Sequence, residues 1–183
     1  MRFSKLFFLF LILFSSSQLQ ADERKNQLNT LFDKLKKNEK SLTANIEQKI
    51  WEIWSTHPTK DRLTIRLAEG SKSVVNNQLV KAVEIFTEVI KEDPNWAEAW
   101  NKRATVLYML GDYQGSQNDI NKVLSLEHRH FGALAGQGLV NIKLKNYEKA
   151  IESYQKAQEI HPTMQSPKIM IKEIQEIINQ QLI

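Results

Sequence analysis

A spacing of 34 residues between similar segments constrains the fold of this chain more than any other feature. Three segments align without gaps, and they begin at residues 77, 111 and 145: NQLVKAVEIF, GDYQGSQNDI and KNYEKAIESY. Similarity at a fixed period of this length indicates repeated helical units, none of which buries its apolar face alone. Stacking three or more such units gives a continuous core, so the period predicts an all-α repeat architecture.

The same residue types return at the same place in each repeat, counted from Leu63, Ala97 and Phe131. Small side chains let antiparallel helices approach closely, large ones fill the space between them, and proline stops a helix from continuing. The small residues at positions 8 and 20, the large residues at position 24 and the prolines at position 32 are Gly70, Ala104, Gly138; Ala82, Ser116, Ala150; Phe86, Ile120, Tyr154; and Pro94, Pro162.

These residues and their period resemble the tetratricopeptide repeat (TPR) family over residues 63–164, and in particular the small exported TPR proteins of Gram-negative bacteria. The resemblance implies a right-handed TPR solenoid of antiparallel helix pairs, with repeats at 63–96, 97–130 and 131–164. Position 7, usually apolar in the family, holds Glu69, Arg103 and Gln137 here. The limits of the first helix of each repeat are therefore less well defined than those of the second.

Both flanks of the repeats predict further helices. In residues 22–60, Ile46, Ile50 and Ile53 share one helical face and fall on positions 20, 24 and 27 if Pro58 ends the unit. We therefore expect an N-terminal helical pair that forms a degenerate repeat, or alternatively a plain hairpin that closes the solenoid. Residues 166–183 begin with a Ser-Pro helix start and predict a capping helix, with an amphipathic membrane helix as the alternative.

The first 21 residues have the pattern of a secretory signal peptide. Two basic residues precede nine consecutive apolar residues at 6–14, and a small residue, Ala21, follows a polar stretch. Nine residues cover only about 14 Å as a helix, about half of a bilayer core. We expect cleavage after Ala21, a periplasmic or secreted protein, and no stable membrane insertion once the segment is removed; retention as an anchor is the alternative.

Composition argues against several classes of function. Residues 61–183 hold fifteen basic and fifteen acidic residues, which speaks against a nucleic-acid partner. The absence of cysteine excludes thiolate metal sites and cysteine nucleophiles. His128 and His130 form an H-x-H pair, but His128 stands where the terminating proline is expected, so we predict no metal site. No catalytic or phosphate-binding motif is present, and we expect neither a cofactor nor an enzymatic activity.

Three other features favour structural roles. Trp51 and Trp54 are expected in the N-terminal core, with anchoring of a partner as the alternative. The glycines at 132, 136 and 138 are interpreted as sites of close helix packing. The lysines at 34, 36, 37 and 40 are interpreted as a solvated helix face, with contact to anionic lipid or an acidic partner as the alternative.

The resemblance also implies a binding surface, because positions 2, 5, 9 and 12 of each first helix line a concave groove in the family. Asn101 and Tyr108 would then hydrogen-bond a ligand backbone. Residues Leu67, Ser71, Lys102, Gly132 and Gly136 stand where the family's carboxylate clamp needs lysine, arginine and asparagine, which argues against capture of an acidic C-terminal tail. The predicted groove residues are Leu67, Ser71, Val74, Asn101, Thr105, Tyr108, Ala135, Leu139 and Ile142.

The predicted function is a non-enzymatic protein–protein interaction module in the cell envelope. It would bind a peptide or protein segment in the concave groove. The alternative is a structural subunit of an envelope assembly that docks through the solenoid edge.

Overall fold

The computed structural model describes residues 22–37 and 40–181, and the described residues form helices joined by short connections. The predicted signal segment lies outside the described residues and stays a prediction. Among the described helices, none is both long and apolar enough to cross a membrane.

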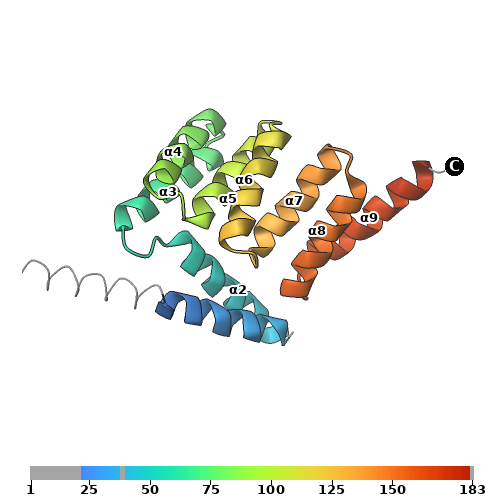
Figure 1. The fold of residues 1–183 in the computed structure, drawn as a ribbon, viewed down its shortest axis with the longest axis horizontal. Coiled ribbons are helices and arrows are strands. Elements are labelled where there is room, and N and C mark those ends of the chain that lie inside the picture. The colour runs from blue at the N-terminus through green and yellow to red at the C-terminus, as the bar shows by residue number, and fades with distance from the viewer. Residues whose placement is uncertain (1–21, 38–39, 182–183) are drawn as a thin grey trace, which may run out of the picture.

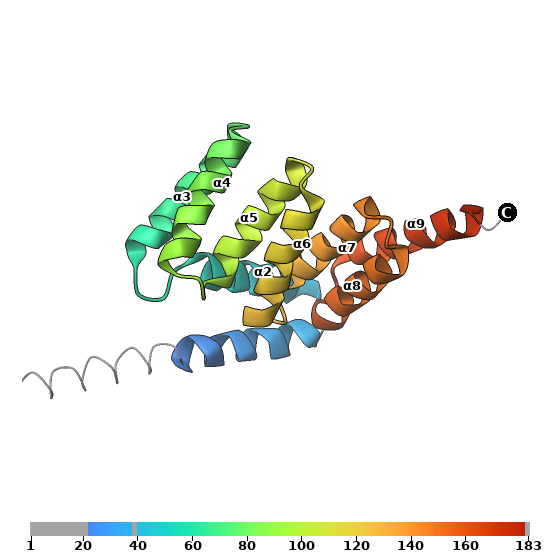
Figure 2. The ribbon, with the colours of Figure 1, turned by 45° about the horizontal axis from the view of Figure 1, so that its top comes forward.

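Three antiparallel helix pairs form the array shown in Figures 1 and 2. Each helix contacts its pair mate and its neighbour along the chain. The fold is the all-α solenoid that the 34-residue period predicts. The pairs are α3 (Asp61–Val75) with α4 (Leu79–Glu92), α5 (Ala97–Met109) with α6 (Tyr113–Leu126), and α7 (Phe131–Lys143) with α8 (Tyr147–Ile160).

The same turn joins the two helices of each pair. Asn77, Gly111 and Lys145 occupy the same repeat position, and each has a positive φ of 56°, 83° and 60°, respectively. In each turn the following amide donates to a carbonyl five residues earlier, as Asn146 N does to Asn141 O at 2.8 Å. This is the Schellman arrangement, in which a left-handed residue ends the helix and reverses the chain.

Small residues at position 8 allow the helices of a pair to pack closely. A Cβ atom added at Gly138 would lie 2.5 Å from the Tyr154 ring, and one added at Gly70 would overlap the ring of Phe86. Both aromatic rings are buried. The small and large positions of the repeat therefore face one another, as the sequence pattern predicts.

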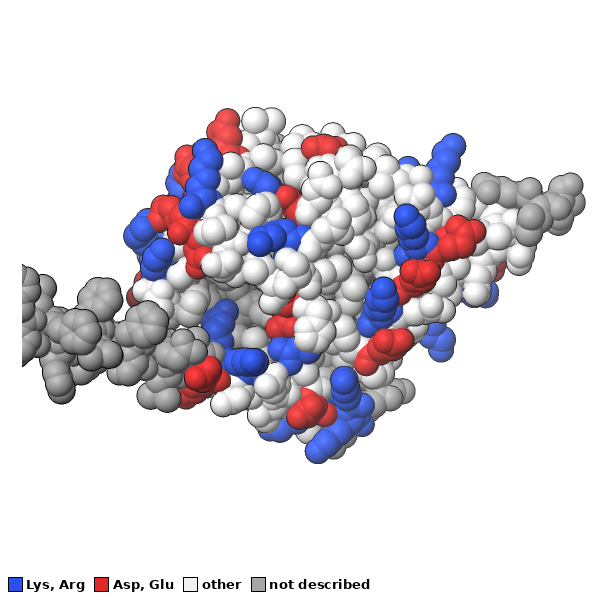
Figure 3. Space-filling model, viewed as in Figure 1, with Lys and Arg blue, Asp and Glu red and all other residues white. Residues whose placement is uncertain are grey.

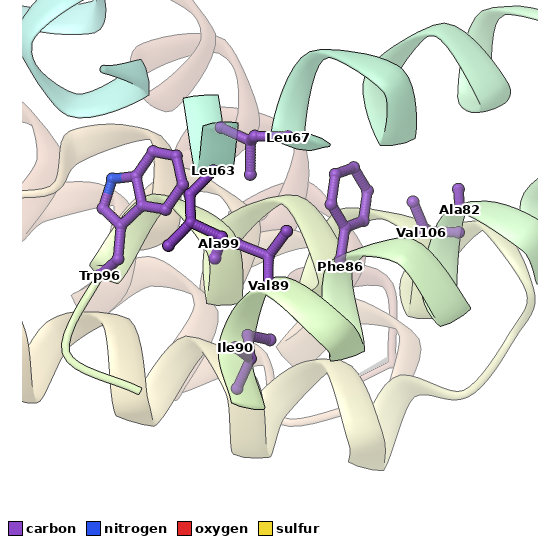
Figure 4. Close-up of a cluster of buried hydrophobic side chains, with 9 residues drawn as sticks. All are labelled: Leu63, Leu67, Ala82, Phe86, Val89, Ile90, Trp96, Ala99 and Val106. Atoms are coloured by element: carbon purple, nitrogen blue, oxygen red, sulfur yellow. The ribbon is translucent and has the colours of Figure 1, made fainter. Parts of the chain in front are cut away.

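The interior of the first pair continues into the second without a break. Figure 4 shows Leu63 and Leu67 of α3 close to Phe86 and Val89 of α4, with Trp96 in the link just before α5. Burial of these side chains provides the hydrophobic stabilisation of the array. At the other end, α9 (Gln165–Gln181) closes the core, because its Ile174 is fully buried against Ala150 and Tyr154.

The N-terminal helical pair, formed by residues 22–36 and α2 (Lys40–Ser55), does not stack on α3 as a degenerate repeat would. It also differs from a hairpin that closes the end of the solenoid. Figures 1 and 2 show it lying along one edge of the array, which we call the connector edge. This edge consists of the links between repeats, residues 93–96, 127–130 and 161–164.

Two features explain this placement. The outer side of the first pair carries charge instead of an apolar face, since Arg66 lies 2.7 Å from Glu69 and also pairs with Glu88. The apolar side of the N-terminal pair instead encloses Phe131 at the start of α7. Contacts of long sequence separation complete the docking: Arg129 donates to Asn29 at 2.7 Å, Trp96 Nε1 donates to Trp54 O at 2.8 Å, and His161 lies 3.2 Å from Glu47.

Candidate protein-binding groove

The first helices of the repeats, α3, α5 and α7, provide the surface on which the sequence predicts a groove. At the connector edge this surface is closed by α2. A Cβ atom added at Gly132, the second residue of α7, would lie 2.6 Å from Cη2 of Trp51. Trp51 also makes edge contacts with His130 and Phe131. The part of the groove nearest the connector edge is therefore filled by a side chain of the protein itself.

A buried polar network lies directly beneath this contact. His130 Nε2 and Asn101 Nδ2 approach the same oxygen of Glu98, Oε2, at 3.0 and 3.1 Å, and Lys102 Nζ lies 3.2 Å from the other oxygen. His130 Nδ1 accepts a hydrogen bond from Ala133 N at 3.1 Å and so caps α7. Its ring stacks on Trp54 with centroids 4.0 Å apart. One network thus joins α2, α5 and α7.

The network also sets the charge of its carboxylate. Burial raises the pKa of the Glu98 carboxyl group, but hydrogen bonding and charge from His130, together with the charge of Lys102, outweigh that effect. The pKa of Glu98 consequently lies below its usual value, and the group is a carboxylate at neutral pH. Because a carboxylate only accepts hydrogen bonds, the amide nitrogen of Asn101 faces Glu98 and the amide oxygen is turned away from it.

Beyond this network lies a hollow of about 80 Å³ between α5 and α7. No charged side chain lines it. Its walls nearest the surface are formed by Asn101, Thr105 and Tyr108 of α5 and by Gly132, Gly136 and Leu139 of α7. We call this space the α5–α7 hollow.

The predicted groove residues separate into two sets. Asn101, Thr105, Tyr108 and Leu139 are brought together around the α5–α7 hollow. The remaining five lie elsewhere: Leu67 in the first core, Ser71 with its hydroxyl bonded to Leu67 O, Val74 against the first core, and Ala135 and Ile142 against the core beneath α9.

Two of the predicted roles need correction. Leu67 is 3% exposed and packs inside the first pair, so it is a core residue and has no surface for a ligand side chain. Asn101 is 9% exposed and already donates to Glu98, so only its amide oxygen is available to a ligand. In both cases tertiary packing covers a position that an isolated helix would leave open.

Sequence reasoning missed two features of this surface. Trp51 was expected in the N-terminal core, and it does pack there, but it also covers Gly132 across the groove. Gly136 was assigned to helix packing, although no atom lies close enough to require a glycine there. The signal for both was the pair of glycines at positions 2 and 6 of α7, where the first two repeats carry larger side chains.

The other candidate features of the sequence lie apart from the hollow. His128 is exposed and His130 is buried, so the two imidazoles of the H-x-H pair do not face a common site. Lys34, Lys36 and Lys37 are exposed on the N-terminal pair. Figure 3 shows acidic and basic side chains interspersed on the face drawn there, with no large area of a single sign.

Comparison with known proteins agrees with this architecture. The sequence profile described as "Tetratricopeptide repeat" matches residues 132–164. A TPR repeat-containing protein of Rhizobium etli is 28% identical over 75% of this chain and 68% of its own length. The mouse tetratricopeptide repeat protein 12 is 29% identical over 54% of this chain, which spans only 14% of that protein.

Among solved structures, the first TPR domain of Spaghetti bound to an HSP90 peptide superposes with a TM-score of 0.62 at 18% identity. The superposition covers 64% of this chain and 93% of that domain. At this identity the likeness concerns the fold alone. The profile match and the similar TPR repeat-containing proteins support a tetratricopeptide repeat protein, in agreement with the period and the paired small and large positions.

Proposed function

We propose that this protein is a non-enzymatic interaction module that binds a peptide or protein segment beside the α5–α7 hollow. The observation that carries the proposal is an uncharged hollow next to a buried amide, Asn101, whose oxygen is turned away from its own partner. Concave, mostly apolar surfaces with a few placed polar groups are typical ligand sites. A solved TPR domain of the same fold holds an HSP90 peptide, which supports this class of function.

The chemistry of the surface favours a ligand without a requirement for acidic groups. Lys102 is the one basic residue at a clamp position, and it is engaged by Glu98. Leu67 and Ser71, at two other clamp positions, carry no charge. We therefore expect recognition by shape and hydrogen bonding, in contrast to capture of a terminal carboxylate.

We further propose that the protein acts in the cell envelope after removal of residues 1–21. The support is the basic and apolar pattern of that segment. Mass spectrometry of the exported protein tests this part of the proposal. The expected result is a chain that begins at Asp22, and an intact Met1 terminus held in the membrane fraction would contradict it.

A second candidate is a structural subunit that docks through the opposite edge, formed by the turns at 76–78, 110–112 and 144–146. Apolar side chains are unusually open on the first two turns, with Val75 85%, Val80 65% and Met109 50% exposed. Exposed apolar groups that cluster at one edge favour a protein contact there.

Site-specific photo-crosslinking in the envelope separates the two candidates. A crosslinking residue is placed at Thr105 or Leu139 beside the hollow, at Val75 or Met109 on the turn edge, and at Asn118 on α6 as the matched control. The proposal expects crosslinks from the hollow positions that are lost on competition with unlabelled protein. Crosslinks confined to the turn edge would replace it by the structural candidate, and labelling equal to that from Asn118 would reject both.

A further inference from the structure

A groove runs along the outer side of the N-terminal helical pair. Two hollows of about 750 and 370 Å³ form it, and they adjoin because Leu31 and Lys49 line both. Every residue that lines either hollow lies within 22–53, whereas the repeats contact the other side of the pair through Phe131. Figures 1 and 2 both show the array on one side of the pair. We call this space, which no described repeat covers, the outer groove.

The floor of the outer groove is apolar. Leu31 and Ile53 are half-buried there, and Leu42 is 47% exposed. The fully buried side chains of the pair, such as Leu28 and Ile50, pack instead in the core at the connector edge. Docking of the pair onto the array therefore does not account for the second apolar strip. An open apolar strip with a polar rim is typical of an interaction surface.

Charge is divided between the two ends of the outer groove. The end next to the link between the two helices is lined by Lys34 and Lys37. The opposite end is lined by Asp22, Glu23 and Glu52. All five side chains are exposed, and none of them forms an ion pair with another described residue. One end of the groove is therefore basic and the other acidic, with both sets of charges open to a partner.

A surface of this kind is complementary to itself when a second copy is turned end for end. A two-fold axis across the groove places the basic end of each copy against the acidic end of the other, so the favourable contact occurs twice. The two helices formed by residues 22–36 then lie antiparallel, and Lys37 of one copy approaches Asp22 and Glu23 of the second copy. A ligand with charge at one end alone would satisfy only half of the groove.

We propose that the outer groove is the surface through which two copies of this chain associate, by antiparallel packing of their N-terminal pairs. Residues 22–36 span about 22 Å as a helix and two adjacent helices are about 20 Å wide, so each copy offers about 450 Å². The resulting total of about 900 Å² is smaller than the interface of most permanent dimers, and we expect a weak, reversible dimer. This inference goes beyond the proposed function and does not depend on it.

Charge reversal at one end or both ends tests the arrangement. Lys34→Glu with Lys37→Glu makes both ends acidic, and Glu23→Lys with Glu52→Lys makes both ends basic. Sedimentation equilibrium of the exported protein, from about 10 μM to about 1 mM, measures the dissociation constant of the dimer. Each double variant should associate at least about tenfold more weakly than the parent protein, because like charges then meet. An equimolar mixture of the two should form heterodimers, and the chain with all four changes should dimerise as the parent protein does.

A matched control lies on the repeats. Lys143→Glu with Lys149→Glu reverses two exposed lysines outside the outer groove and should leave the dissociation constant unchanged. Tryptophan emission and the Tm establish that each variant is folded before its association is compared.

Three outcomes would overturn the inference. The first is a parent protein that stays monomeric at about 1 mM, or a dimer that neither double variant weakens. The second is a mixture of the two double variants that forms no heterodimer, because end-to-end complementarity requires one. The third is a monomer that retains an amphiphilic molecule in native mass spectrometry, which would assign the outer groove to a small ligand. None of these results bears on peptide binding beside the α5–α7 hollow, which is tested separately.

Discussion

His130 Nε2 and Glu98 Oε2 lie 3.0 Å apart, and neither side chain exposes any surface to solvent. The pair joins the start of α7 to the first turn of α5, so it fixes the two walls of the α5–α7 hollow relative to one another. Since Asn101 donates to the same carboxylate oxygen, the orientation of the amide beside the hollow depends on this pair as well. Stacking of Trp54 on His130 extends the coupling to the N-terminal pair.

The unfolding free energy should fall in acid because the Glu98 carboxylate becomes protonated. Its pKa is lowered in the folded protein, so its carboxylate adds stability that is present in full above the unfolded pKa, about 4.3, and is lost as the pH falls through the folded pKa. Glu98→Gln should cost about 1–3 kcal/mol at pH 7 and should flatten the acid dependence of the unfolding free energy. Urea unfolding from pH 7 to pH 2 measures both effects. The exposed Glu84→Gln is the control, and an unchanged acid slope in Glu98→Gln would contradict the assignment.

The docking of the N-terminal pair should depend on the bare backbone at Gly132. Gly132→Ala places a methyl group against Trp51 and should cost about 1–3 kcal/mol in unfolding free energy, with a red shift of tryptophan emission as the ring is displaced. Gly136→Ala, four residues along the same helix, should gain roughly 0.5–1 kcal/mol. Thermal and urea unfolding compare the two variants. An equal gain for both would mean that α2 does not hold Trp51 on this surface.

A substitution in the turn between α7 and α8 should raise the stability of the protein. Lys145 has a φ of 60°, a conformation that strains a residue with a Cβ atom and suits glycine. Lys145→Gly is therefore expected to raise the unfolding free energy by about 0.5–1 kcal/mol. Lys149→Gly, on the exposed side of α8, should lower it by a similar amount. Urea denaturation of both variants gives the comparison, and a loss in both would contradict the role assigned to this turn.

Binding beside the hollow should be insensitive to salt. The lining carries no charge, and burial of apolar surface is not screened when the Debye length falls from roughly 10 to 3 Å between about 0.1 and 1 M salt. Tyr108→Ala should reduce the binding free energy of a partner identified by crosslinking by about 1–3 kcal/mol, because large aromatic side chains are common binding hot spots. Calorimetric titration at both salt concentrations measures this.

The control for that prediction lies on the N-terminal pair. Joint replacement of Lys34, Lys36 and Lys37 by Gln should change the affinity little. Binding that disappears at high salt and in the lysine variant, yet survives Tyr108→Ala, would move the functional surface to the N-terminal pair.

The repeat architecture was predictable because its determinants are local and periodic. The pairing of Gly138 with Tyr154, or of Gly70 with Phe86, joins residues sixteen apart, and this spacing recurs in each unit. Helix ends follow from the turn residues and prolines between the helices. A pattern that repeats three times along the chain therefore predicted the all-α solenoid.

The position of the N-terminal pair and the shape of the groove were decided by tertiary structure alone. His161 meets Glu47 across 114 residues and Arg129 meets Asn29 across 100, and no periodic pattern relates positions so far apart. The apolar face of residues 46–54 specified burial, but the same face fits a repeat, a hairpin or an edge. The choice among these partners depended on Phe131 and the charged outer side of α3. Burial of Leu67 and Asn101 and the open space at Gly136 were likewise decided by the packing of the repeats, because a helix face becomes core or site only when its neighbour is in place.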